Sequence, residues 1–99
     1  MKKKIAILGS TGSIGDTLLN IVKKDSTNIE VILLTANSNY KKLLKQAKKF
    51  KVKNLIITNK DKFILTKKLT KNLNLNIYND FKNLEKIFKK KTDYTMSSI

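Results

Sequence analysis

The 99-residue sequence contains no cysteine, no histidine, no proline and no arginine. Without cysteine it has neither disulfides nor thiolate metal ligands, and without histidine it lacks the commonest general base. The acidic residues are spread out and form no plausible metal cluster or carboxylate pair: Asp16, Asp25, Glu30, Asp61, Asp80, Glu85 and Asp93. We expect all seven to cap helices or to lie on solvated faces. We therefore expect no catalytic residue and no metal ligand in this chain.

Long apolar runs are also missing. The apolar run behind the lysine-rich N-terminus, residues 5–8, is too short for a secretory signal, and no segment approaches the length of a membrane span. We therefore expect a cytoplasmic location and no contact with a membrane.

The net charge of +15 comes from lysine alone. Arginine, which reads guanine with two hydrogen bonds and stacks on bases, is absent, and the phenylalanines stand at helical spacing among leucine and isoleucine. We therefore attribute the charge mainly to solvated faces and expect no specific nucleic-acid partner.

Apolar periodicity alternates between strand-like and helix-like segments. Strands are expected over residues 4–8, 30–35, 54–58, 76–78 and 93–99. Helices are expected where apolar residues recur on one face: Ile14, Leu18, Ile21 and Val22; Tyr40, Leu43, Leu44, Ala47 and Phe50; Leu65, Leu69 and Leu73 after a cap at Asp61; and Phe81, Leu84, Ile87 and Phe88 after a cap at Asp80. Such alternation predicts an α/β fold with a Rossmann-like, doubly wound parallel sheet.

The last expected strand, residues 93–99, has no helix after it to cover its face. Met96 and Ile99 would then be exposed, and an unpaired strand edge promotes association. We therefore interpret residues 1–99 as a truncated N-terminal portion of a nucleotide-binding domain, without catalytic and C-terminal domains.

A glycine motif, G-x-x-G-x-x-G, lies between the first expected strand and helix. Gly9 allows a sharp turn off the strand, Gly12 allows close approach of a pyrophosphate, and Gly15 allows the helix to pack closely on the sheet. The helix N-terminus offers free N–H groups to phosphates, and Thr11 and Ser13 add hydroxyl donors. Because a strand precedes the motif and an amphipathic helix follows it, we interpret it as a dinucleotide site rather than a plain turn.

The turn after the second strand should select the cofactor. NAD-specific folds place an acidic residue there, whereas this chain has Asn37, Ser38 and Asn39. Asn37 and Ser38 can donate hydrogen bonds to a 2′-phosphate, and Lys41 or Lys42 lies one turn away to add charge. Asn39 can also simply cap the next helix. The absence of an acid predicts NADPH in preference to NADH.

Residues 4–15 (KIAILGSTGSIG), residues 34–39 (LTANSN) and residues 93–99 (DYTMSSI) together resemble the 1-deoxy-D-xylulose 5-phosphate reductoisomerase family. The resemblance implies NADPH-dependent isomerisation and reduction of 1-deoxy-D-xylulose 5-phosphate, a phosphorylated sugar, to 2-C-methyl-D-erythritol 4-phosphate in non-mevalonate isoprenoid biosynthesis. It further implies a homodimer and a divalent metal, Mg²⁺ or Mn²⁺, whose ligands lie beyond Ile99.

The resemblance assigns two groups of cofactor-binding residues. The pyrophosphate would be held by Thr11, Gly12, Ser13 and Ile14, and the 2′-phosphate by Asn37, Ser38 and Asn39. One alternative is another NADP-dependent reductase of the aspartate-semialdehyde dehydrogenase type, which would carry a catalytic cysteine later in the chain. The other is a small basic nucleic-acid-binding module, which would bind mixed DNA with steep salt dependence and without response to NADPH.

Overall fold

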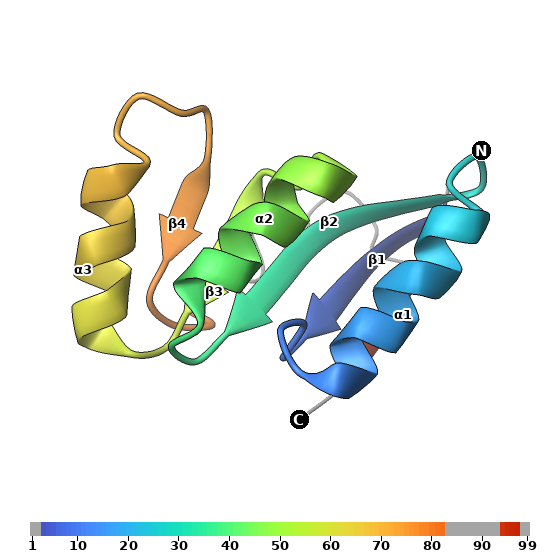
Figure 1. Cartoon of the computed structure of the whole chain (residues 1–99), viewed down its shortest axis with the longest axis horizontal. Coiled ribbons are helices and arrows are strands. Elements are labelled where there is room, and N and C mark those ends of the chain that lie inside the picture. The colour runs from blue at the N-terminus through green and yellow to red at the C-terminus, as the bar shows by residue number, and fades with distance from the viewer. Residues whose placement is uncertain (1–2, 83–93, 98–99) are drawn as a thin grey trace.

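The computed structural model describes residues 3–82 and the backbone of residues 94–97, which form a parallel sheet with helices (Figure 1). The elements follow one another as β1 (Lys3–Leu8), α1 (Ser13–Lys24), β2 (Ile29–Ala36), α2 (Tyr40–Phe50), β3 (Asn54–Ile57), α3 (Lys60–Leu69), β4 (Asn76–Tyr78) and β5 (Tyr94–Ser97). Each expected strand is present, with ends that differ by a few residues from the apolar runs.

All paired strands are parallel, and their order across the sheet is β4-β3-β2-β1-β5. From β1 the chain moves strand by strand to β4, and β5 lies on the other side of β1. The direction of winding therefore reverses at β1, which is the switch point of a doubly wound sheet. The predicted Rossmann-like α/β class is confirmed.

The strands β1, β2 and β3 place buried residues on both faces of the sheet, as their continuous apolar runs predict. Ile5 and Ile7 face the larger core, which the helices cover, while Ala6 belongs to a smaller cluster on the opposite face with Leu33 and Ile56. Figure 1 shows α1 and α2 side by side over one face, with α3 farther along beside β4. This layering brings the turns after β1 and β2 to the same edge of the sheet.

The inward face of α1 differs from the prediction. Leu19 and Val22 are buried together with Gly15, whereas Ile14 and Ile21 are 59% and 55% exposed. Gly15, Leu19 and Val22 are spaced by four and three residues and so form one stripe. Close packing of Gly15 on the turn before the helix sets this rotation, and apolar spacing alone missed it.

The predicted face of α2 is correct. Leu43 and Ala47 are buried, and Tyr40, Leu44 and Phe50 pack against the same core. Lysines occupy much of the solvent side, in agreement with a solvated charge.

Helix α3 differs from the prediction at both ends. Its N-cap is Asn59, whose side chain accepts a hydrogen bond from the Lys62 N–H at 3.0 Å, and not Asp61. The helix ends at Leu69, and both Leu69 and Leu73 are 58% exposed.

Two threonines are buried along α3, whereas Leu69 and Leu73, two of the three expected leucines, are exposed. The Thr66 hydroxyl donates to the Lys62 carbonyl at 2.6 Å, and the Thr70 hydroxyl donates to the Thr66 carbonyl at 2.8 Å. These bonds satisfy the hydroxyl donors within the backbone, so both threonines can be buried.

The carboxylate of Asp80 accepts a hydrogen bond from the Lys82 N–H at 3.0 Å, which is the contact of a capping residue. The helix that we expected after it, with Leu84, Ile87 and Phe88, lies outside the described residues, as do the side chains of Met96 and Ile99. No helix in the described part of the chain combines the length and the apolar character needed to cross a membrane.

Candidate functional site

Two turns meet at the carboxyl ends of neighbouring strands. The first, called the glycine turn here, spans residues 9–15, from the end of β1 into the first turn of α1, and the second, the asparagine turn, spans residues 37–39 between β2 and α2. Since β1 and β2 pair in parallel, the two turns lie at one edge of the sheet, beside the switch point (Figure 1). Ligands of doubly wound sheets bind in this place.

The glycine turn needs glycine at two positions for the fold itself. Gly9 has φ of 70°, in the left-handed region that other residues rarely adopt. A Cβ atom on Gly15 would lie 2.2 Å from the Ser10 carbonyl oxygen, which is backbone and cannot easily move away. The chain's own packing therefore requires Gly9 and Gly15.

Gly12 is different. Its φ is −78°, and a Cβ atom there would meet only the Gly9 carbonyl oxygen, at an ordinary 3.8 Å. Neither the backbone conformation nor the packing of the chain requires glycine at this position. A glycine here leaves open space at the start of α1 for a group from outside the chain.

The N-terminus of α1 offers unused hydrogen-bond donors. Gly12 is the N-cap and supplies no side chain, and the first N–H to bond back to it belongs to Asp16. The N–H groups of Ser13, Ile14 and Gly15 donate to no group within the described residues. These donors and the helix dipole favour an anion at this position.

The asparagine turn is exposed and contains no acidic residue. Asn39 caps α2, because its side-chain oxygen accepts a hydrogen bond from the Lys42 N–H at 3.3 Å. The side-chain oxygen of Asn37 accepts from the Thr58 hydroxyl at 2.8 Å. Both amides therefore keep their NH₂ donors available, and Ser38 keeps its exposed hydroxyl. Capping by Asn39 and ligand binding are compatible.

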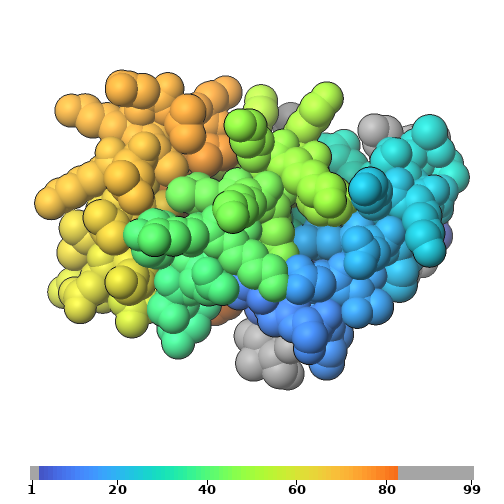
Figure 2. Space-filling view, viewed as in Figure 1, coloured from blue at the N-terminus to red at the C-terminus, as the bar shows by residue number. Residues whose placement is uncertain are grey.

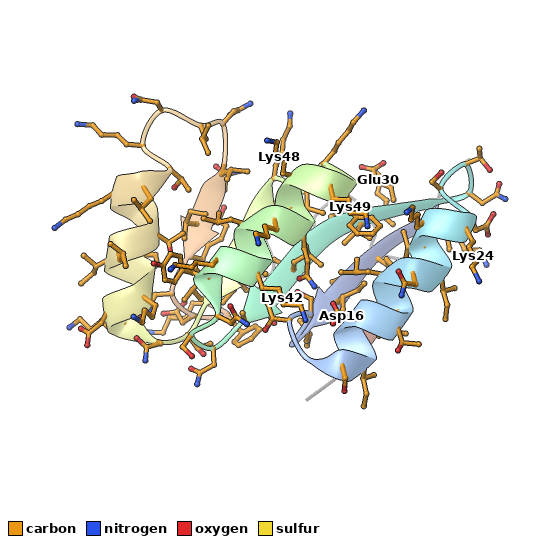
Figure 3. All side chains as sticks on the ribbon, viewed as in Figure 1. Asp16, Lys24, Glu30, Lys42, Lys48 and Lys49 are labelled. Carbon is orange, nitrogen blue, oxygen red and sulfur yellow. The ribbon has the colours of Figure 1, made fainter. Side chains whose placement is uncertain are left out.

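Lys42 does not extend toward the asparagine turn as a free charge. Its Nζ lies 2.5 Å from Oδ2 of Asp16, so the pair joins α2 to the first turn of α1 (Figure 3). Our expectation that Asp16 is only a cap or a solvated carboxylate is wrong in this respect. Lys41 remains exposed, in the first turn of α2.

Sequence reasoning missed three polar residues that hold the two turns together. Thr35 accepts hydrogen bonds from two N–H groups of the glycine turn. Its hydroxyl oxygen accepts from the Gly9 N–H at 2.8 Å, and its carbonyl oxygen accepts from the Ser10 N–H at 2.9 Å. Ser10 in turn bonds to Gln46 of α2. All three are buried, and a polar residue on an otherwise apolar strand or helix face was the signal that could have indicated them.

No group of three or more acidic, histidine or cysteine side chains among residues 3–82 could hold a metal ion. The cluster of site residues is therefore one of backbone N–H groups, hydroxyls and amides. Its chemistry is suited to phosphate groups and not to a metal ion.

Comparison with known proteins agrees with this chemistry. Residues 5–99 match the family model for 1-deoxy-D-xylulose 5-phosphate reductoisomerase. The reductoisomerase of Pelagibacter ubique is 54% identical over 99 residues, covering 98% of this chain and 26% of the relative. That of Phocaeicola vulgatus is 41% identical over 78 residues, covering 79% of this chain and 20% of the relative.

Solved structures agree as well. The Zymomonas mobilis reductoisomerase in complex with NADPH superposes with a TM-score of 0.85 at 27% identity, covering all of this chain and 26% of that one. A DOX-P reductoisomerase in complex with NADPH, fosmidomycin and magnesium superposes with a TM-score of 0.81 at 29% identity, covering 98% of this chain and 24% of that one. The chain spans about a quarter of the length of these relatives. With the fold, the glycine turn and these matches in agreement, the chain belongs to the 1-deoxy-D-xylulose 5-phosphate reductoisomerase family.

Proposed function

We propose that this chain binds NADPH across the glycine turn and the asparagine turn, as the cofactor-binding part of a 1-deoxy-D-xylulose 5-phosphate reductoisomerase. The observation that carries the proposal is Gly12, which the chain's own packing does not require and which stands at an uncapped helix N-terminus. Complexes of related reductoisomerases with NADPH support the choice of cofactor.

The pyrophosphate is assigned to Thr11, Gly12, Ser13 and Ile14. Open space beside Gly12 admits the phosphates, and the N–H groups that begin α1 supply donors and partial positive charge. The exposed Ser13 and the half-buried Thr11 offer hydroxyls at the same turn. Exposed Ile14 offers an apolar surface to the cofactor.

The 2′-phosphate is assigned to Asn37, Ser38 and Asn39. Two amide NH₂ groups and one hydroxyl can donate to it, and no carboxylate in the turn repels it. We assign the added positive charge to Lys41, because the ammonium of Lys42 is bound to Asp16. We expect NADPH to bind more tightly than NADH.

The complete activity requires more than these residues. Bound NADPH supplies the hydride, and the described residues contain neither a histidine nor a group able to hold a metal. We assign the Mg²⁺ or Mn²⁺ ligands and the sugar-phosphate site to the parts of the relatives that this chain does not span. A homodimer and a cytoplasmic location remain predictions.

NADPH binding at this site can be tested through the backbone amide signals of the three glycines. All three glycines, Gly9, Gly12 and Gly15, lie in the glycine turn, so a chain labelled with ¹⁵N-glycine gives three backbone amide signals that all report this site. We expect NADPH to shift the Gly12 signal in a saturable manner. Sodium chloride at equal ionic strength controls for nonspecific attraction to the lysines. Signals that stay unchanged at saturating NADPH would rule out the site.

A further inference from the structure

Gln46 is the one glutamine of the chain, and it lies on the buried face of α2. It is 7% exposed and stands between Leu43 and Ala47, which face the same core. Burying an amide costs free energy unless its donors and acceptor are all satisfied. Gln46 therefore needs partners, and all of them come from the glycine turn and the helix that follows it.

Each polar atom of the Gln46 side chain has a partner 30 or 36 residues away in sequence. Its Oε1 accepts from the Ser10 hydroxyl at 2.9 Å, and its Nε2 donates to the Ser10 carbonyl at 2.8 Å. Nε2 also lies 3.3 Å from Oδ1 of Asp16. A carbonyl and a carboxylate both require the NH₂ side of the amide, so this orientation is well defined.

The Ser10 carbonyl is held from two sides. A Cβ atom on Gly15 would collide with its oxygen at 2.2 Å, so α1 packs against the carbonyl as closely as glycine permits. From α2, Gln46 binds the same oxygen. Ser10 is fully buried and two residues before Gly12, so fixing its carbonyl restricts the path of the chain into Gly12.

The Gln46 side chain also contacts Asp16, a charged residue near the start of α1. Asp16 lies in the first turn of α1, where a carboxylate opposes an approaching phosphate. Both of its oxygens are engaged from α2: Oδ1 accepts from Gln46, and Oδ2 accepts from Lys42, which Figure 3 shows beside Asp16. In the space-filling view, the blue surface of α1 and the green surface of α2 lie against each other (Figure 2).

We propose that Gln46 is a positioning residue of the dinucleotide site: from α2 it fixes the Ser10 carbonyl, and with it the conformation of the glycine turn that receives the pyrophosphate. The part of this inference that concerns cofactor binding rests on the proposed function, namely that the chain binds NADPH. Because the pyrophosphate is common to both cofactors, loss of Gln46 should weaken NADPH and NADH equally. The asparagine turn, which distinguishes the cofactors, keeps its own contacts with Lys42 and Thr58.

The main test compares Gln46→Met with Ile77→Val. Methionine keeps the approximate length and volume of glutamine without its hydrogen bonds. Ile77→Val is the control: it shortens a buried side chain in β4, an edge strand separated from β1 by two other strands. We expect Gln46→Met to raise Kd for both cofactors on the order of tenfold with an unchanged NADPH to NADH ratio. Ile77→Val should lower stability and leave both Kd values unchanged, which separates positioning from general destabilisation.

A second readout needs no ligand. In the ¹⁵N-glycine-labelled chain, Gln46→Met should shift the Gly9 and Gly12 signals and speed their hydrogen exchange, and Ile77→Val should not. If Gln46→Met fails to fold, Ser10→Ala removes the hydroxyl that donates to Oε1 at 2.9 Å and lies 3.4 Å from the Thr35 carbonyl oxygen, and it should give smaller changes of the same kind. Unchanged glycine signals and Kd values in a folded variant would overturn the inference. Altered signals in a chain that binds no NADPH would support the positioning and refute the proposed function.

Discussion

Each glycine of the glycine turn has a different physical reason to be glycine. Gly9 has a left-handed φ, and Gly15 has no room for a Cβ atom beside Ser10. Gly12 has neither constraint, and an added Cβ would make only an ordinary contact. At the scale of single residues, Gly12 is therefore the position where a substitution should affect binding far more than folding.

Gly12→Asp should abolish most NADPH affinity while the fold survives. The new carboxylate would stand at the uncapped start of α1, where we assign the pyrophosphate, and would repel it. Calorimetry would measure NADPH affinity, and circular dichroism would measure folding. Asn72→Asp is the matched control, because it changes the net charge equally in an exposed turn after α3. Equal NADPH binding by Gly12→Asp and the unmodified chain would refute the assignment.

Asn37→Asp should weaken NADPH roughly tenfold and spare NADH, because a carboxylate repels the doubly charged 2′-phosphate and not a hydroxyl. The fold should be retained, since aspartate keeps an oxygen that can accept from the Thr58 hydroxyl. Fluorescence titration with both cofactors checks the ratio. Comparable binding of the two cofactors to the unmodified chain would already contradict the predicted preference.

At the scale of elements, packing decided which face of α1 is buried, and apolar spacing alone did not predict it. Ile14, Leu18, Ile21 and Val22 form a plausible helical face in the sequence, yet the close contact of Gly15 with Ser10 turns α1 so that Leu19 is buried. In α2 the predicted face is correct because the apolar residues recur at helical spacing on one face and lysines occupy much of the other. The two helices then meet through polar residues that no apolar pattern reveals.

Leu19→Ala should lower the free energy of unfolding by about 2–4 kcal/mol, because Leu19 is buried in the core beneath α1. Ile21→Ala, on the exposed face of the same helix, should change it by less than about 0.5 kcal/mol. Urea unfolding followed by circular dichroism measures both. A larger loss for Ile21→Ala would mean that α1 has the rotation expected from spacing alone.

At the scale of the whole molecule, the described residues form one parallel sheet with helices, and they include no group of three or more acidic, histidine or cysteine side chains that could hold a metal ion. The chain spans about a quarter of its relatives' length, and the described sheet has β4 and β5 at its edges, each paired on one side. Strand edges favour association with other chains. We therefore expect the isolated 99 residues to be marginally stable, aggregation-prone or dimeric, which analytical ultracentrifugation and thermal melting would test. A monomer that melts cooperatively would contradict this.

The isolated chain should also give no turnover of 1-deoxy-D-xylulose 5-phosphate with NADPH and Mg²⁺, because its described residues hold no metal site. A chimera in which these residues replace the matching part of the Pelagibacter ubique reductoisomerase, 54% identical, should oxidise NADPH when the sugar phosphate is added. The absorbance of NADPH follows both reactions, and the same chimera with Gly12→Asp is the control. Turnover by the 99-residue chain alone would refute our placement of the catalytic residues.

Much of the fold and part of the site follow from the sequence because their signals are local. A strand, three glycines at intervals of three residues and an amphipathic helix occur within about twenty residues. The absence of an acidic residue after the second strand can be read from three consecutive residues, Asn37, Ser38 and Asn39. Such patterns depend on neighbours along the chain, so they predicted the α/β class, the glycine turn and the asparagine turn without coordinates.

Only the tertiary structure decided which polar residues hold those turns in place. Gln46 meets Ser10 across 36 positions and Lys42 meets Asp16 across 26, so neither contact leaves a local pattern. The buried threonines of α3 are similar, because their hydroxyls are satisfied by backbone carbonyls and no longer count as polar in packing. Hydrogen bonds between distant segments depend on how the helices rotate and dock, and that rotation is set by close packing around Gly15.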